Sequence, residues 1–77
     1  MYSFQNQKKM PDDWHQADII AAIKKSGTNM SKLSEASGYS RNSLRNALYR
    51  PYPKAEKIIA KAIGVEPEDI WPSRYAL

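Results

Sequence analysis

The chain has 77 residues, a net charge of +4 and no cysteine, which excludes a disulfide framework and a thiolate metal site and favours a cytoplasmic protein. A chain of this length has room for one hydrophobic core and therefore for one domain. We expect no signal peptide and no membrane contact, because no apolar run approaches the roughly 20 residues that a transmembrane helix requires.

The first segment is predicted to be a flexible arm, and the folded domain to occupy residues 12–77. Residues 1–11 are polar, and their scattered apolar side chains follow no helical or strand period. Terminal segments of this kind are usually poorly ordered. Lys8 and Lys9 would allow the arm to touch phosphate groups.

The first helix is predicted at Trp14–Ser26. Its apolar positions recur at helical spacing, at Ile19, Ile20 and Ile23. Asp12 or Asp13 is the expected N-cap, and Gln16, three residues after Asp13, completes a pattern that resembles a capping box. Gly27 then follows, where a left-handed residue commonly ends a helix.

A second helix and a turn are predicted between residues 28 and 40. Thr28 or Asn29 supplies the cap, and a short apolar face follows at Met30, Leu33 and Ala36. Gly38 can adopt a positive φ that other residues avoid, which suits a tight turn. The ring of Tyr39 is expected to pack between the helices on either side of this turn.

The third helix is predicted at Arg41–Tyr49, with Ser40 as its N-cap. Its inner face is expected to carry the apolar residues at i, i+3 and i+4, which are Leu44, Ala47 and Leu48. Two more helices follow, one from Pro53 to the residue before Gly64 and a last short one at Pro67–Trp71, which Pro72 ends. The predicted class is all-α, with five short helices.

The second helix, the turn and the third helix together have the size of a helix-turn-helix, whose second helix lies in the DNA major groove. The outer face of the third helix carries arginine and asparagine, which can form paired hydrogen bonds with guanine and adenine edges. The charge pattern agrees, because residues 39–61 hold six bases and one acid. The candidate DNA-binding residues are Ser31, Lys32, Ser40, Arg41, Asn42, Ser43, Arg45, Asn46, Tyr49, Arg50 and Lys54.

Other chemistry has little support in the sequence. His15, the single histidine, has no nucleophile or ligand set beside it, and no phosphate loop or metal-ligand spacing appears, so we expect neither an enzyme nor a cofactor. Trp14 and Trp71 are interpreted as core residues, because a small domain has little else of that volume.

Four stretches together resemble one protein family: DWHQADIIAAIKKSG, LSEASGYSRNSLRNALYR, PKAEKIIAKAIG and the closing IWPSRY. From Asp13 to Tyr75 the chain resembles the Ner family of Mu-like phage DNA-binding regulators and their bacterial relatives. The resemblance implies a lambda-repressor-like helix-turn-helix domain that binds operator DNA and turns down transcription. It also implies major-groove contacts from Ser40 to Tyr49, while residues 1–10 have no counterpart in it.

The leading hypothesis is therefore a sequence-specific double-stranded DNA-binding repressor. Two alternatives stay open: an activator, and an adaptor whose basic helical face binds an acidic protein instead of DNA. The expected state is a monomer or weak dimer, and two copies can occupy half-sites one helical turn apart on an operator.

Overall fold

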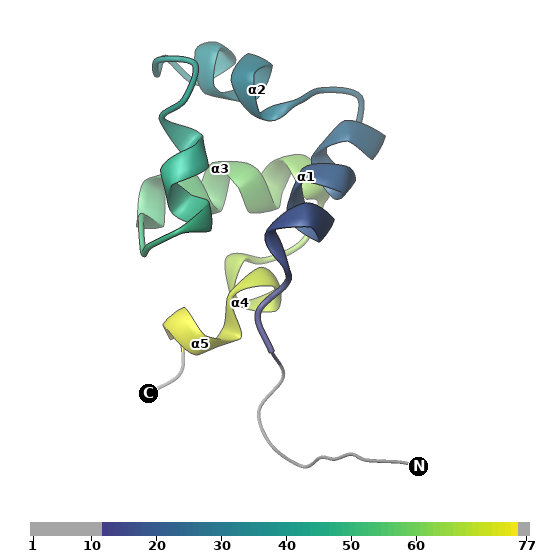
Figure 1. The fold of residues 1–77 in the computed structure, drawn as a ribbon, viewed down its shortest axis with the longest axis vertical. Helices are drawn as coiled ribbons and strands as arrows, with labels where there is room; N and C mark the ends of the chain where they lie inside the picture. Colours follow the sequence, from purple (N-terminus) through teal and green to yellow (C-terminus); the bar gives the residue numbers. More distant parts are fainter. Residues whose placement is uncertain (1–11, 76–77) are drawn as a thin grey trace.

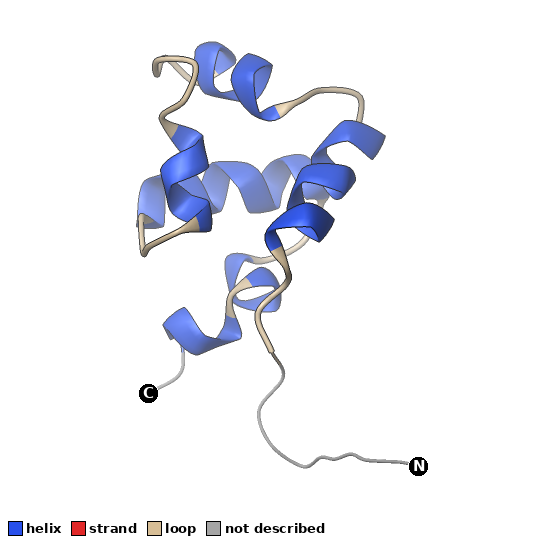
Figure 2. Cartoon of the chain, viewed as in Figure 1, coloured by secondary structure: helices blue, strands red, loops and turns tan. Residues whose placement is uncertain are grey.

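The computed structural model describes residues 12–75, and these form a helical domain without a strand (Figures 1 and 2). The predicted arm, residues 1–11, lies outside the described residues. In chain order the helical elements are α1 (Gln16–Lys25), α2 (Met30–Ala36), the 3₁₀ helix η2 (Leu44–Leu48), α3 (Pro53–Ile63), α4 (Pro67–Ile70) and α5 (Pro72–Tyr75). The all-α prediction is confirmed, and no helix within residues 12–75 is long and apolar enough to cross a membrane.

Helix α3 is the centre of the domain, because η2, α1 and α4 all pack against it (Figure 1). Helix α2 lies on the far side of η2, and α5 packs on α4. Every helix contributes to one core except α5, whose four residues include no buried one. The buried apolar residues are Ile19, Ile23, Met30, Leu44, Ala47, Leu48, Ala55, Ile59, Ala60, Ile70 and Trp71. Trp71 is therefore a core residue, as predicted, and Trp14 packs against the core while half-buried.

Helix α1 begins two residues later than predicted, and its cap is a different residue. His15 is the N-cap, and its Nδ1 atom accepts a hydrogen bond from the Ala17 N–H at 3.0 Å. The prediction of an aspartate cap was wrong because Asp13 is engaged elsewhere, with Ser73. The Trp14 N–H also donates to the Ile70 carbonyl at 2.8 Å. These two contacts hold the segment before α1 against the C-terminal end of the domain.

Helix α2 and its turn follow the prediction closely. Asn29 is the N-cap, since its Oδ1 atom accepts from the Lys32 N–H at 2.8 Å. Gly38 has a φ of +86°, as the tight turn requires, and the half-buried Tyr39 packs against the core. The inner face differs at one position: Ala36 is exposed, whereas Ser34 is fully buried.

The predicted third helix is shorter and more tightly wound than expected. The structure has a turn at residues 41–43 and then the 3₁₀ helix η2, rather than an α-helix over Arg41–Tyr49. In an α-helix the Leu44 N–H would donate to the Ser40 carbonyl. It donates instead to the buried Ser34 hydroxyl at 3.3 Å, while the Ser43 N–H takes the Ser40 carbonyl. Ser40 is consequently not a cap, and its hydroxyl lies 2.7 Å from that of Ser43.

The C-terminal third holds one helix more than predicted. Helix α3 begins at Pro53 and ends before Gly64, whose φ is +95°, as expected. Helix α4 ends at Ile70, one residue before the predicted end. Pro72 does not end the helical region: it opens α5, since proline suits the first position of a helix.

Candidate nucleic-acid interface

The α2–turn–η2 unit has the arrangement of a helix-turn-helix. The inner side of η2 is fully committed to the core through Leu44, Ala47 and Leu48. Its outer side is polar: Asn46 is exposed, and so are Arg41 and Asn42 in the turn before it. Tyr49, which follows η2, is 64% exposed, the largest exposure of any big apolar side chain in the described residues. These four side chains are exposed as predicted, whereas Arg45, which was predicted to point outward with them, is half-buried.

A polar hollow of about 410 Å³ lies where α1, α2 and η2 meet. Three cationic side chains line it, each from a different segment: Lys24 from the end of α1, Arg41 from the turn, and Arg45 from η2. The hydroxyl-bearing Ser31, from the first turn of α2, lines it as well. Lys24 was not among the predicted site residues, since the sequence alone does not reveal that the end of α1 lines the same hollow as Arg41 and Arg45.

One anion lies close to this group of cations. The Nε atom of Arg41 is 3.8 Å from a carboxylate oxygen of Glu35, with the two side chains 73% and 57% exposed. An ion pair so exposed contributes little to stability, because water and salt screen it. Arg41 is thus held loosely and can exchange Glu35 for another anion.

The remaining predicted site residues are spread more widely. Lys32, in the first turn of α2, is exposed; Ser40, in the turn after α2, is exposed as well, and Ser43 is half-buried. Arg50 and Lys54 are also exposed, but they lie beyond the other end of η2, on either side of the start of α3. The structure therefore brings Ser31, Arg41 and Arg45 to one hollow and leaves Arg50 and Lys54 outside it.

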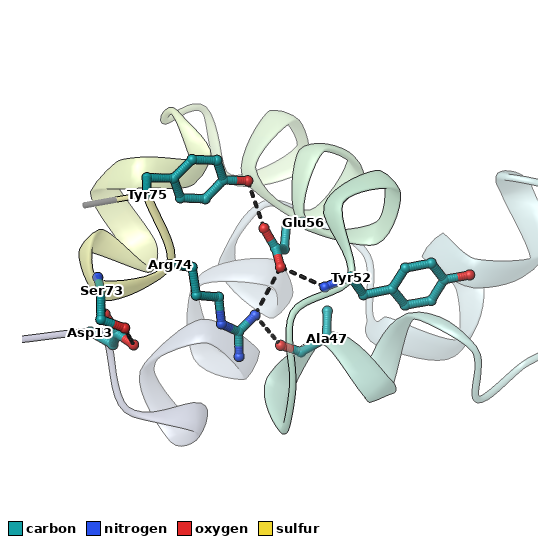
Figure 3. A network of polar contacts seen from close by, with 7 residues as sticks. All are labelled: Asp13, Ala47, Tyr52, Glu56, Ser73, Arg74 and Tyr75. Atoms are coloured by element: carbon teal, nitrogen blue, oxygen red, sulfur yellow. Dashed lines mark hydrogen bonds and ion pairs between the residues drawn. The ribbon is translucent and has the colours of Figure 1, made fainter. Parts of the chain in front are cut away.

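A polar network around one buried carboxylate, which the sequence analysis missed, joins α3, α5 and the end of η2 (Figure 3). Glu56 of α3 is only 2% exposed, and its carboxylate accepts three hydrogen bonds. The donors are the Tyr75 hydroxyl at 2.6 Å, the Tyr52 N–H at 2.7 Å and the Nη1 atom of Arg74 at 3.1 Å. The same Arg74 atom donates to the carbonyl of Ala47, in η2, at 2.6 Å.

The pKa of Glu56 reflects two opposing effects. Burial raises the pKa, but the hydrogen bonds from Tyr75, the Tyr52 backbone and Arg74 favour the charged carboxylate and together bring the pKa below its ordinary value. Burial and the hydrogen bond to Glu56 raise the pKa of Tyr75 to about 12. At neutral pH the network therefore holds an ionised glutamate and a neutral tyrosine.

A signal for this network was present in the sequence. Glu56 is the one acid among residues 39–61, and it falls on the apolar stripe of α3, three and four residues before Ile59 and Ala60. A carboxylate on an inner face requires a cationic or hydrogen-bonding partner. Nothing in the sequence identifies that partner as Arg74, 18 residues away.

Comparisons with known proteins agree with this geometry. A family model described as winged helix-turn-helix DNA-binding matches residues 13–77. The negative regulator of transcription of Escherichia phage D108 is 49% identical over 70 residues, covering 91% of this chain and 96% of the relative. The negative regulator of transcription of phage Mu is 54% identical over 63 residues, covering 82% and 84% of the two chains. The DNA-binding protein Ner of a Mu-like prophage in Haemophilus influenzae is 44% identical over 70 residues.

The chain belongs to the Ner family of helix-turn-helix DNA-binding proteins. The resemblance inferred from its four motifs is confirmed. The solution structure of the Mu Ner protein superposes on this Ner-family chain with a TM-score of 0.71 at 54% identity, covering 82% of this chain and 85% of that one. Within residues 12–75 the Ner-family chain has the helix-turn-helix of the matching family model but no strand from which a wing could form.

A bacterial relative carries a different kind of name. The sugar fermentation stimulation protein B of Escherichia coli K12 is 59% identical over 63 residues, covering 82% of this chain and 68% of the relative. This chain is thus similar both to proteins named for negative regulation and to a protein named for stimulation.

Proposed function

We propose that this protein represses transcription by occupying a specific double-stranded operator sequence. The observation that carries the proposal is that η2 and the turn before it have two different sides. The apolar side is buried in the core, and the exposed side presents arginine and asparagine. Those two residue types recognise guanine and adenine edges in the major groove. No cofactor enters the proposal.

The proposed contacts fall into two groups. Arg41, Asn42, Arg45 and Asn46 are assigned to base edges, with Ser43 and Tyr49 beside them. Contacts with the phosphate backbone are assigned to the margins, to Ser31, Lys32, Ser40, Arg50 and Lys54. The hollow at Lys24 supplies one further cation on the same side of the domain. Phosphate contacts position the protein, whereas the base contacts select the sequence.

Repression is favoured over activation by the relatives in phages D108 and Mu, both named negative regulators of transcription. Activation is the second candidate, because the Escherichia coli relative is named for stimulation. A reporter gene placed behind the bound promoter separates the two. Repression predicts that expression of the protein lowers the reporter signal, and activation predicts a rise.

The proposal is tested by selecting bound duplexes from a random DNA pool with the full chain. Enrichment of one sequence, bound more tightly than random duplex, is the expected result. Two inverted half-sites about 34 Å apart in the recovered sequence would indicate that two copies bind together. If no sequence is enriched and random duplex also fails to bind at low salt, the DNA-binding proposal is wrong and the adaptor hypothesis replaces it.

A further inference from the structure

The element that is proposed to read DNA is too short to hold its own position. Helix η2 has five residues, and its N-cap position, Ser43, makes no side-chain capping bond. Helices of this length are not stable in isolation, and the geometry of 3₁₀ hydrogen bonds is poorer than that of α-helical ones. Its orientation must therefore come from other parts of the fold.

Two polar contacts hold the two ends of η2. At the first residue the Leu44 N–H donates to the Ser34 hydroxyl of α2. Near the last residue the Ala47 carbonyl accepts from Arg74 of α5. The Arg50 N–H donates to the Asn46 carbonyl and is therefore not the donor to the Ala47 carbonyl. Arg74 therefore satisfies a carbonyl that the end of a short helix leaves open.

Arg74 is itself held rigidly. Its side chain is 13% exposed, its guanidinium lies 4.9 Å from the centre of the Trp71 ring, and the atom that binds Ala47 also binds Glu56. Glu56 in turn accepts from the Tyr52 N–H, in the link between η2 and α3. Arg74 thus connects α5 to the end of η2, and the Glu56 carboxylate connects α5 to the link that follows η2 (Figure 3).

We infer that Arg74 is a positioning residue for sequence recognition: it fixes the end of η2 so that the exposed arginine and asparagine side chains meet the bases in one register. This inference rests on the proposed function. Arg74 is too buried to reach the DNA itself, so its effect on recognition passes through Ala47. On this view α5 takes part in DNA recognition by positioning η2.

The test compares two variants that share a neutral glutamine at position 56 and differ at position 74. Glu56→Gln keeps Arg74 and its bond to Ala47. The double variant Glu56→Gln with Arg74→Met removes that bond and leaves neither charge buried alone. For both variants we measure the affinity for the duplex selected by the wild-type protein and the affinity for random duplex. The temperature is one at which circular dichroism shows each variant to be folded.

The double variant is expected to lose about tenfold in the ratio of selected to random affinity relative to Glu56→Gln, which is the scale of one base contact. The Leu48–Arg50 amide protons are expected to exchange faster with solvent in the double variant alone. Tyr75→Phe, which removes a bond to the same carboxylate but touches no residue of η2, should lower the melting temperature and leave the ratio unchanged.

Two results would overturn the inference, and they are distinguishable. If the wild-type protein prefers the selected duplex and the double variant keeps the same preference, the positioning role of Arg74 is wrong and the proposed function stands. If the wild-type protein itself shows no preference, the proposed function is wrong and the inference falls with it.

Discussion

The carboxylate of Asp13 accepts two hydrogen bonds from Ser73, one from its N–H at 2.9 Å and one from its hydroxyl at 2.7 Å. These residues are 60 positions apart, and their contact joins the segment before α1 to α5. Helix α5 is therefore held from two sides, by Asp13 and by Glu56. Because α5 contributes no buried residue, these polar contacts carry much of its attachment.

Removal of the Asp13 carboxylate is expected to destabilise the domain. Asp13→Ala should lower the free energy of unfolding by about 1 kcal/mol, the ordinary net contribution of a hydrogen bond at a partly exposed site. The measurement is urea denaturation followed by circular dichroism. Asp12→Ala is the matched control, since the carboxylate of Asp12 is exposed and forms no hydrogen bond within residues 12–75, and this variant should unfold at the wild-type urea concentration. Equal midpoints for the two variants would contradict the prediction.

Acid should weaken the domain through Glu56. Its pKa is lower in the folded protein than the ordinary value of 4.5, so the stabilisation is fully present above pH 4.5 and is lost as the pH falls through the folded-state pKa. Glu56→Gln should reduce the slope of unfolding free energy against pH in this acid range. Denaturation at a series of pH values provides the measurement, and Glu68→Gln, on the exposed side of α4, should keep the wild-type slope.

Alkali should act on the same network through Tyr75. Its pKa is raised to about 12, so its contribution is complete below pH 10 and disappears as the pH rises toward 12. The ultraviolet absorbance of tyrosinate should show a component that ionises late and comes from Tyr75. That late component is expected to be absent from Tyr75→Phe and present in Tyr49→Phe, whose tyrosine is largely exposed. A late component that persists in Tyr75→Phe would assign it to another residue.

Asn46 provides the sharpest test of base reading. Asn46→Ala should weaken binding to the selected duplex by about 1–3 kcal/mol and barely change binding to random duplex, because an asparagine amide makes its paired bonds with adenine alone. Gel-shift titrations with both duplexes measure the difference. Gln16→Ala removes an exposed amide from the first turn of α1 and should leave both affinities intact. An equal loss on both duplexes would place Asn46 on the phosphate backbone.

Lys24 and Lys25 form a natural pair for testing the phosphate contact. Both are exposed and adjacent at the end of α1, but Lys24 alone lines the hollow with Arg41 and Arg45. Lys24→Ala should weaken binding to every duplex similarly and reduce the slope of log affinity against log salt by about 1. Lys25→Ala should keep the wild-type slope. Identical slopes for the two variants would remove the hollow from the interface.

The sequence was a good guide wherever one local pattern decided the outcome. Leu44, Ala47 and Leu48 are buried as their spacing predicted, and Gly38 has the positive φ that its turn predicted. The outward position of Arg41, Asn42 and Asn46 followed from the same periodicity. Their contact with DNA stays a prediction.

Local patterns failed wherever a distant group competed for a backbone or side-chain partner. The Ser34 hydroxyl accepts a hydrogen bond from the Leu44 N–H, and as a result η2 is a 3₁₀ helix where an α-helix was expected. The Asp13 carboxylate accepts a hydrogen bond from Ser73, and His15 is the N-cap of α1 instead of Asp13.

By itself the sequence determined the helical class, the apolar face of each main helix and the side on which the arginine and asparagine residues emerge, because these depend on spacing within one segment. Tertiary structure alone decided that α1 contributes Lys24 to the hollow, that Glu56 is paired with Arg74 and that Arg74 binds the end of η2. Such pairings depend on which side chains come into contact when separate helices pack. The periodicity within one segment carries no information about contacts between segments.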